Sequence, residues 1–319
     1  LVDNSGQANN YSIASASSNI TQRPLNLSGS RAYDSTRTAS GSDLSFTNIV
    51  SGETLGLTGS GVLDSPAAGS RTIVNTNTLA ISDGSGIATN YTLTNGTLTM
   101  TIVPRSTTVS GTKTYDGTTN VSSSNLTSFS NLAGSDTLSL SGTGTISSAD
   151  VGTGKTVNTS GLTIDNSSGV GTNYTLSSAT VNVTERVIGL SGVRAFDGTN
   201  NASSADLSIS NLVSGENLTL SGLGTVPNAT VEMNKAITLG SLSISDGSGG
   251  KSSNYTLTGG SHTLDISQLS VNVTGSRQYD GTKTVNSSDL NLTNLVSGET
   301  VSLTGAGTVA DENVGANKT

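Results

Sequence analysis

The sequence predicts an all-β fold, a tandem array of small antiparallel β-sandwich (Ig-like) modules of about 82 residues with almost no helix. Three observations lead to this prediction. The composition is rich in Thr, Ser, Asn and Gly and poor in charge, which is typical of strands and turns rather than of disordered chains. Aromatic motifs recur at a constant spacing, and apolar residues alternate with polar ones between Gly-rich turns.

The composition excludes several classes of function. Of the 319 residues, 32% are hydrophobic and 11% are charged, so no single large core is expected. The net charge of −8 is spread without runs, which disfavours nucleic acid and anionic membranes as partners. The absence of cysteine excludes disulfides, thiolate metal sites and thiol catalysis. We find no pattern for a membrane span or a signal peptide, and we interpret the chain as an internal fragment.

The internal repeat is visible in three motifs. The first is Tyr-Asp-Gly or a close variant, with successive copies 82, 81 and 83 positions apart, at Tyr33-Asp34, Tyr115-Asp116-Gly117, Phe196-Asp197-Gly198 and Tyr279-Asp280-Gly281. The second, Asn-Tyr, recurs with spacings of 80, 83 and 81, at Asn10-Tyr11, Asn90-Tyr91, Asn173-Tyr174 and Asn254-Tyr255. The third is a turn that ends in an acid, at Glu53, Asp136, Glu216 and Glu299. The agreement of the three motifs defines one period.

The period divides the chain into repeats. Residues 22–103 are predicted as repeat 1, 104–184 as repeat 2 and 185–268 as repeat 3. Residues 1–21 are predicted to be the C-terminal strands of a preceding repeat, and 269–319 the N-terminal part of repeat 4. All seven tyrosines fall in the two aromatic motifs, so we expect them to be the nucleus of a small core in each module.

Strands are predicted where apolar and polar side chains alternate with period two, since this pattern buries one face of a strand. Clear examples are Leu79-Ala-Ile81, Val181-Asn-Val183, Leu218-Thr-Leu220 and Val271-Asn-Val273. Gly-rich turns such as Asp83-Gly84-Ser85-Gly86 and Asp246-Gly247-Ser248-Gly249 separate them. No stretch carries a sustained 3.6-residue apolar stripe, and no shorter sub-period supports a β-solenoid.

Taken together, these motifs resemble the YDG domain, a family similar to the bacterial repeat modules called MBG. The resemblance rests on Tyr115-Asp116-Gly117-Thr118-Thr119, on Leu140-Ser141-Gly142, on Asn173-Tyr174-Thr175-Leu176 and on the stretch from Ala310 to Thr319. It implies an extracellular, structural fibre within a large secreted bacterial adhesin related to filamentous haemagglutinin. Two departures are Ser35 in place of the motif glycine and Phe196 in place of its tyrosine. We expect neither to disturb the fold, since Ser tolerates most turns except those that need a positive φ.

Residues with reactive or ligating side chains are few. His262 has no equivalent in the other repeats, so we expect an exposed strand residue rather than a catalytic one. The recurring acids are expected to cap a turn or to form a short ion pair. The same structural role is expected for the recurring bases, Arg31, Lys113, Arg194 and Arg277, and Arg71, Lys155, Lys235 and Lys318.

Some of the Gly-rich loops carry residues that are typical of calcium or phosphate sites. Calcium stays an alternative for the Asp83 and Asp246 loops, which lack the ligand spacing of an EF-hand. The run from Gly247 to Ser252 fails as a phosphate loop, because Ser245 stands where a glycine is needed and a strand follows. We therefore predict no catalytic, cofactor-binding or metal site.

The function expected from the sequence is that of a non-enzymatic stalk at a bacterial cell surface, supporting adhesion or a biofilm matrix. Its expected partners are the neighbouring repeats of the same chain. A further hypothesis joins copies of the chain head to tail by strand complementation. The alternative function is a set of repeated modules that bind a glycan or a host surface by avidity, with calcium as a stabiliser.

Overall fold

The computed structural model describes all residues 1–319, and it confirms the all-β prediction. The chain forms short strands, and its helical segments are eight 3-10 turns of three residues each. No helix is long and apolar enough to cross a membrane. Composition explains this: Thr and Val favour strands, while frequent Gly, Asn and Ser end them after a few residues.

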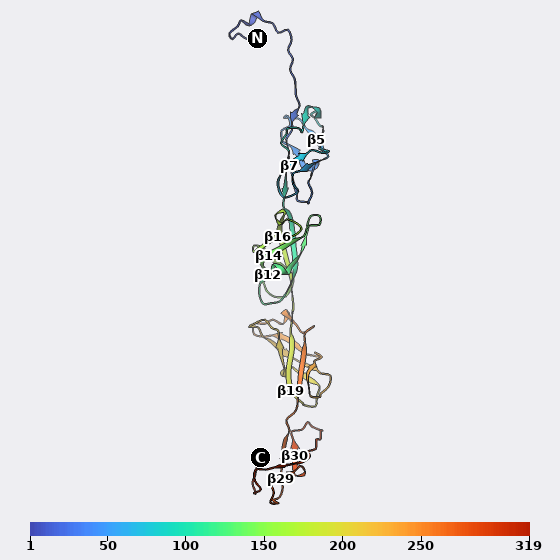
Figure 1. The fold of residues 1–319 in the computed structure, drawn as a ribbon, viewed down its shortest axis with the longest axis vertical. Helices are drawn as coiled ribbons and strands as arrows, with labels where there is room; N and C mark the ends of the chain where they lie inside the picture. The colour runs from blue at the N-terminus through green and yellow to red at the C-terminus, as the bar shows by residue number, and fades with distance from the viewer. The chain divides into compact units, whose positions relative to one another are not determined.

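The chain divides into two compact units, and Figure 1 shows the strands of each. The first unit comprises Leu1–Thr112, Asn120–Ser147 and Gly154–Val181. The second comprises Lys113–Thr119, Ser148–Thr153 and Asn182–Thr319. Two loops of repeat 2, one of which carries the Tyr115 motif, therefore belong to the same unit as repeats 3 and 4.

Repeat 1 is built around a six-stranded sheet with the order β3-β6-β7-β10-β2-β4, and β5 pairs with β8 and β1 with β9 beside it. Its strands are β1 Arg23–Pro24, β2 Leu27–Ala32, β3 Thr38–Ser40, β4 Leu44–Phe46, β5 Leu55–Thr58, β6 Ser60–Leu63, β7 Gly69–Asn75, β8 Ala80–Asp83, β9 Tyr91–Thr92 and β10 Thr99–Val103. The 3-10 turns η2 Gly41–Asp43 and η3 Ala88–Asn90 lie between them.

Repeat 2 has two sheets, with orders β13-β11-β17-β15 and β12-β14-β16, and the second sheet is labelled in Figure 1. Its strands are β11 Arg105–Thr114, β12 Asn120–Ser122, β13 Leu126–Ser130, β14 Leu138–Thr145, β15 Gly152–Val157, β16 Leu162–Asn166 and β17 Tyr174–Thr184. Its 3-10 turns are η4 Ser123–Asn125 and η5 Gly171–Asn173.

Repeat 3 contains the sheet β21-β19-β27-β24 and three two-stranded pairs, β20-β23, β22-β25 and β18-β26. Its strands are β18 Arg186–Val187, β19 Gly189–Ala195, β20 Asn201–Ser203, β21 Leu207–Ser210, β22 Leu218–Ser221, β23 Leu223–Thr225, β24 Glu232–Ala236, β25 Ser243–Asp246, β26 Tyr255–Thr256 and β27 His262–Ser267. Its 3-10 turns are η6 Ser204–Asp206 and η7 Ser252–Asn254.

Residues at the two ends of the chain form less structure. Residues 269–319 contain β28 Asn272–Gly275, β29 Thr284–Asn286, η8 Ser287–Asp289, β30 Leu290–Thr293 and β31 Ala306–Thr308. Residues 1–21 contain the turn η1 Ala8–Asn10 and no strand, which corrects the strands predicted there. A strand without a neighbour leaves its backbone amides unpaired, and residues 1–21 pair with no strand of the chain.

Strand direction differs from the antiparallel prediction in several strand pairs. Most pairs are antiparallel, but the two-residue pairs β1–β9 and β18–β26 are parallel. So are the longer pairs β2 with β10 and β19 with β27. These are the long strands near the start and the end of their repeats. When neighbouring first and last strands run in the same direction, the chain enters a module at one end and leaves it at the other. The parallel pair therefore suits a tandem array.

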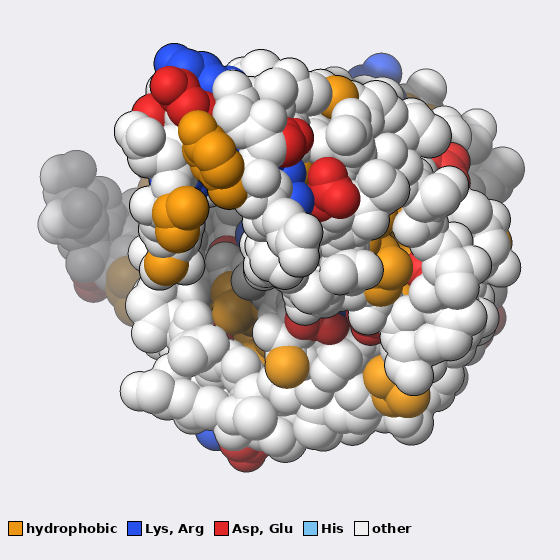
Figure 2. All heavy atoms as spheres, turned by 90° about the horizontal axis from the view of Figure 1, so that it is seen from below, with side chains coloured by type: hydrophobic (Ala, Val, Ile, Leu, Met, Phe, Trp, Pro, Cys, Tyr) orange, Lys and Arg blue, Asp and Glu red, His pale blue; other side chains and the backbone are white.

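Repeats 1 to 3 each have a small core of alternating side chains, whereas residues 269–319 contain no buried side chain. In repeat 1, Leu27, Leu63, Met100 and Ile102 are almost completely buried, and in repeat 3 the same is true of Leu264 and Ile266. Burial of each such side chain away from water stabilises the fold by about 1.5–3 kcal/mol. The core of repeat 1 also includes Ala133 and Tyr174 from repeat 2. The surface seen in Figure 2 is mostly uncharged and polar, with acidic and basic side chains in small groups.

Candidate functional site

Two tyrosines from successive repeats meet on one carboxylate. Tyr33 of repeat 1 and Tyr174 of repeat 2 pack edge to face, with ring centroids 5.4 Å apart and planes at 76°. Their hydroxyls donate hydrogen bonds to the same oxygen, Asp136 Oδ2, over 3.1 and 2.6 Å. Both rings are only 5% exposed. We call this arrangement, Tyr33, Asp136 and Tyr174, the first tyrosine–carboxylate junction.

The same arrangement recurs one period later. Tyr115 of repeat 2 and Tyr255 of repeat 3 pack with centroids 5.4 Å apart and planes at 78°. Here the longer Glu216 receives one hydroxyl on each oxygen, Tyr115 on Oε1 at 2.5 Å and Tyr255 on Oε2 at 2.7 Å. Charge-assisted bonds of this length are stronger than neutral ones, and edge-to-face rings add to them. This second tyrosine–carboxylate junction, Tyr115, Glu216 and Tyr255, makes the arrangement a repeated structural element.

The Asn-Tyr motif supplies the tyrosine that the later repeat contributes to each junction. A 3-10 turn, η5 or η7, ends at its asparagine and places the tyrosine at the start of the next strand. The Tyr174 hydroxyl also accepts the Ala133 amide at 3.1 Å, as Tyr255 accepts that of Val213. Each hydroxyl therefore both donates and accepts, which leaves no polar atom of the buried ring end unpaired.

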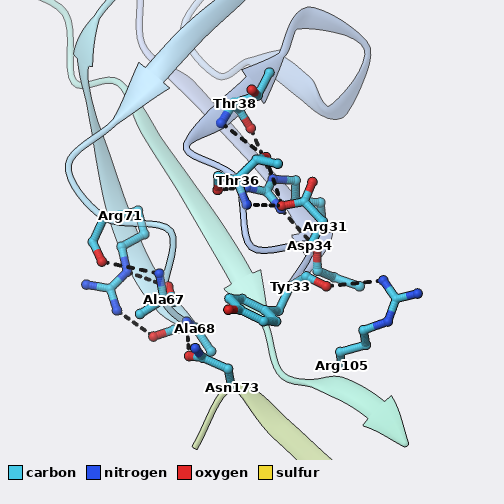
Figure 3. Close-up of polar contacts among 12 residues, drawn as sticks. Arg31, Tyr33, Asp34, Thr36, Thr38, Ala67, Ala68, Arg71, Arg105 and Asn173 are labelled. Atoms are coloured by element: carbon cyan, nitrogen blue, oxygen red, sulfur yellow. Dashed lines mark hydrogen bonds and ion pairs between the residues drawn. The ribbon is translucent and has the colours of Figure 1, made fainter. Parts of the chain in front are cut away.

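The asparagine of the motif bonds to the preceding repeat. Asn173 Oδ1 accepts the backbone amide of Ala68 at 2.8 Å, as Figure 3 shows. One period later, Asn254 Oδ1 accepts the amide of Val151 at 2.9 Å. In repeat 1, by contrast, the equivalent Asn90 is exposed. The motif therefore carries two inter-repeat contacts, one from each of its residues.

The Tyr-Asp-Gly motif supplies the tyrosine of the earlier repeat, and the residues that follow this tyrosine form a tight turn. In each copy the aspartate Oδ1 accepts the amide and the hydroxyl of the threonine two residues later. The same oxygen pairs with the base three residues earlier; for Asp116 the partner is Lys113 at 2.8 Å, and Figure 3 shows the pair of Arg31 with Asp34. The recurring bases Arg31, Lys113, Arg194 and Arg277 thus hold the turn, as expected from their recurrence.

The third residue of the motif needs a left-handed backbone. Its φ is +76° at Gly117, +78° at Gly198 and +75° at Gly281. Ser35 occupies the same turn at φ +66°, so the turn is kept, but it is one of the positive-φ turns that a serine tolerates poorly. A Cβ in this region crowds the backbone and costs about 1–2 kcal/mol. The structure therefore stores some strain in the turn of repeat 1.

Burial and the shared carboxylate change the ionisation of the tyrosines. Burial, followed by the Asp136 carboxylate, raises the pKa of Tyr174 to about 12 and raises that of Tyr33. Burial and Glu216 raise the pKa of Tyr115 and Tyr255 in the same way. The phenols therefore stay protonated and keep donating across the neutral pH range.

The second junction has an additional ion pair. Lys251 Nζ lies 2.7 Å from Asp150 Oδ2, and Asn254 Nδ2 donates to Asp150 Oδ1 at 2.9 Å. The hydrogen bond from Lys251, followed by that from Asn254, lowers the pKa of Asp150 to about 2. Both charged side chains are substantially exposed, so the pair contributes modestly.

The acids and aromatic residues predicted from the sequence have a more specific role than expected. Asp136 and Glu216 are tyrosine acceptors and not merely turn caps, and Glu53 accepts the hydroxyl of Tyr91 within repeat 1. Glu299 is exposed. Tyr11 and Tyr279 are 71% and 64% exposed, whereas Tyr91 is only 4% exposed although it takes part in no junction. Tyrosine burial thus occurs at junctions as well as within modules.

Three of the second set of recurring bases, Arg71, Lys235 and Lys318, close loops within their own repeats. Arg71 donates to the carbonyls of Ala67 and Ala68, as Figure 3 shows. Lys235 pairs with Glu232 at 2.9 Å and donates to Asn228, and Lys318 pairs with Asp311.

The remaining candidates take ordinary structural positions. His262 lies half-buried in β27, not exposed as predicted, and its Nε2 is 2.8 Å from the Leu257 carbonyl. Asp83 and Asp246 accept backbone amides of the turns that follow them, at 2.7 Å each. No group of three or more His, Cys, Asp or Glu side chains is arranged to hold a metal ion.

A third recurring set of bases, Arg23, Arg105 and Arg186, was missed from the sequence, and one of them bonds across a junction. Arg105, at the start of β11, donates to the Tyr33 carbonyl of repeat 1 at 3.3 Å and to the Asn131 backbone and side chain of repeat 2 at 2.8 Å each. Figure 3 shows its guanidinium beside Tyr33. Within their own repeats, Arg186 donates to the backbone and side chain of Asn211, and Arg23 donates to the carbonyl of Asn48. Their spacing of 82 and 81 positions was a signal that could have revealed them.

Comparison with known families gives one finding. The family model described as the YDG domain matches residues 19–100, 96–181, 185–263 and 266–319. These segments span nearly the whole chain. A search of curated proteins gave no match.

Proposed function

Because the chain belongs to the YDG-domain family, we propose that its tandem repeats serve as an extracellular stalk or fibre of a bacterial surface adhesin. The role is structural and not catalytic: the repeats set the distance between a cell and whatever the rest of the protein binds. Adhesion to a surface or to a biofilm matrix would then be the biological result. The observation that carries this proposal is the tyrosine–carboxylate junction.

The junction supports a spacer role because it joins successive repeats through a defined geometry. Modules linked only by a flexible segment move independently, and their separation fluctuates. Here two rings, one shared carboxylate and an asparagine bond connect each pair, and the arrangement occurs twice. Nearest-neighbour interfaces of this kind add stability with each repeat, so length can grow without any core growing.

Small-angle X-ray scattering on the 319-residue chain tests the proposal. A compact domain of this length has a radius of gyration of about 20 Å. If each module adds about 25–40 Å, a rod of four has a radius of gyration of about 30–45 Å. The Glu216→Ala variant should broaden the distribution of distances, since the second junction would lose its shared acceptor. A value near 20 Å for the unmodified chain would refute the stalk.

Localisation needs a separate experiment. Antibodies against the repeats should label intact, unpermeabilised cells of the bacterium that makes the protein, and protease added outside the cells should remove the label. Labelling only after permeabilisation would contradict the extracellular part of the proposal. The scattering result would still stand in that case.

A further inference from the structure

The third residue of the Tyr-Asp-Gly motif faces the next repeat at close range. A Cβ at Gly117 would lie 2.7 Å from Cγ1 of Val213 in repeat 3. A Cβ at Gly198 would lie 2.7 Å from Cγ1 of Val296 in repeat 4. Cβ atoms do not approach other carbons this closely, so a valine in the next repeat leaves room only for glycine.

At the first junction both partners differ together. The motif residue is Ser35, which has a Cβ, and the residue at the valine position of repeat 2 is Ala133, which is smaller. The adjoining residue, Gly134, is also free of a side chain, and a Cβ there would lie 2.9 Å from the Ser35 hydroxyl. In the other repeats this adjoining position is Ser51, Ser214 or Ser297. The larger residue in repeat 1, Ser35, is thus matched by smaller residues in repeat 2, Ala133 and Gly134.

From this matching we infer that the junctions are neighbour-specific: a serine-bearing motif fits only an alanine-bearing repeat, and a glycine-bearing motif fits a valine-bearing one. Each Tyr-Asp-Gly motif therefore recognises a following repeat whose facing residue, alanine or valine, has the matching size. A serine against valine overlaps, whereas a glycine against alanine leaves a gap. This inference concerns which repeats can be neighbours, and it holds whether or not the array is a stalk.

Neighbour specificity has a physical use in a chain of similar repeats. Tandem modules of similar sequence are prone to pair with the wrong copy during folding. Discrimination between partners commonly relies on a steric clash with the wrong one. The Ser35–Ala133 pair supplies such a clash, because repeat 1 cannot pack its motif against the valine of repeat 3 or of repeat 4.

Hydrogen exchange of two amides measures the opening of each junction directly. The Ala68 amide donates to Asn173 across the first junction, and the Val151 amide donates to Asn254 across the second. Neither amide belongs to a residue that the test changes. In the full chain, Ala133→Val should speed exchange at Ala68 by about tenfold to a hundredfold, as overpacking of a tight interface does. The double variant Ser35→Gly with Ala133→Val should return the rate to within about threefold of the original.

The mirror experiment applies the same logic to the second junction. Gly117→Ser should speed exchange at Val151, and Val213→Ala in the same chain should reverse much of that change. Gly215→Ser is the matched control, since Gly215 also has a positive φ of +86° but nothing within 4 Å of its added Cβ. It should leave Val151 nearly unchanged. Additive effects without rescue at either junction, or an equal effect of Gly215→Ser, would overturn the inference.

Discussion

Replacing Glu216 by alanine removes the shared acceptor of the second tyrosine–carboxylate junction. The variant leaves the hydroxyls of Tyr115 and Tyr255 without the carboxylate that they reach at 2.5 and 2.7 Å. A hydrogen bond to a charged group contributes about 1.5–3 kcal/mol. Because Glu216 is half-buried and its solvent contact lowers this value, the two bonds together should be worth about 2–4 kcal/mol. Glu216→Gln should cost about half as much, since an amide keeps one acceptor oxygen.

The assay should report the junction and not the whole chain, because an array of repeats does not unfold in a single two-state step. Exchange of the Val151 amide serves this purpose, since it bonds to Asn254 of the next repeat. A loss of 2–4 kcal/mol corresponds to exchange about 30-fold to 900-fold faster. Glu299→Ala is the matched control, because Glu299 occupies the same turn of repeat 4 and is exposed. A change below threefold in Glu216→Ala, or an equal change in Glu299→Ala, would refute the reasoning.

Three further predictions follow from the same contacts. The pKa of Tyr174 is raised to about 12 from an ordinary 10, so the contribution of Tyr174 to the stability of the first junction is fully present below about pH 10 and is lost as the pH rises toward 12. Urea unfolding followed by tyrosine absorbance will measure this loss. The lowered pKa of Asp150, about 2 against 3.8, means that its contribution is full above about pH 4 and is lost as the pH falls toward 2. The loss should stay below about 1 kcal/mol and be smaller, but not absent, in Lys251→Met, because the hydrogen bond from Asn254 to Asp150 remains. Arg194→Lys should cost less than about 1 kcal/mol in thermal unfolding, since Lys113 fills the same position in repeat 2, whereas Arg194→Met should cost about 2–4 kcal/mol because three backbone carbonyls lose their donor.

Much of the fold could be predicted because it is encoded locally. The alternation of Val181 with Val183 predicts one buried face, and both side chains are buried in β17. The aspartate and threonine of each Tyr-Asp-Gly motif predict a turn, since the aspartate can bond two residues ahead. The direction of β2 against β10 could not be predicted, because alternation is the same for parallel and antiparallel neighbours.

The conformation of Ser35 also required the structure. A serine in place of glycine is consistent with several turns, and only the observed φ of +66° shows that this one is left-handed. The size match between Ser35 and Ala133 was not visible either, since the two residues lie in different repeats and nothing in the sequence says that they meet.

The sequence by itself determined the period, the all-β class and the identity of the recurring residues. Only the tertiary structure decided which copies of these residues touch. The physical reason is that equivalent residues recur in every repeat, so the sequence does not say whether a residue contacts its own repeat or the next one. Tyr91 and Tyr174, for example, are equivalent positions one repeat apart, and the sequence alone favours neither as the partner of Tyr33. In the folded chain Tyr33 packs on Tyr174, and the same geometry recurs at Tyr115 and Tyr255, so these tyrosines join one module to the next.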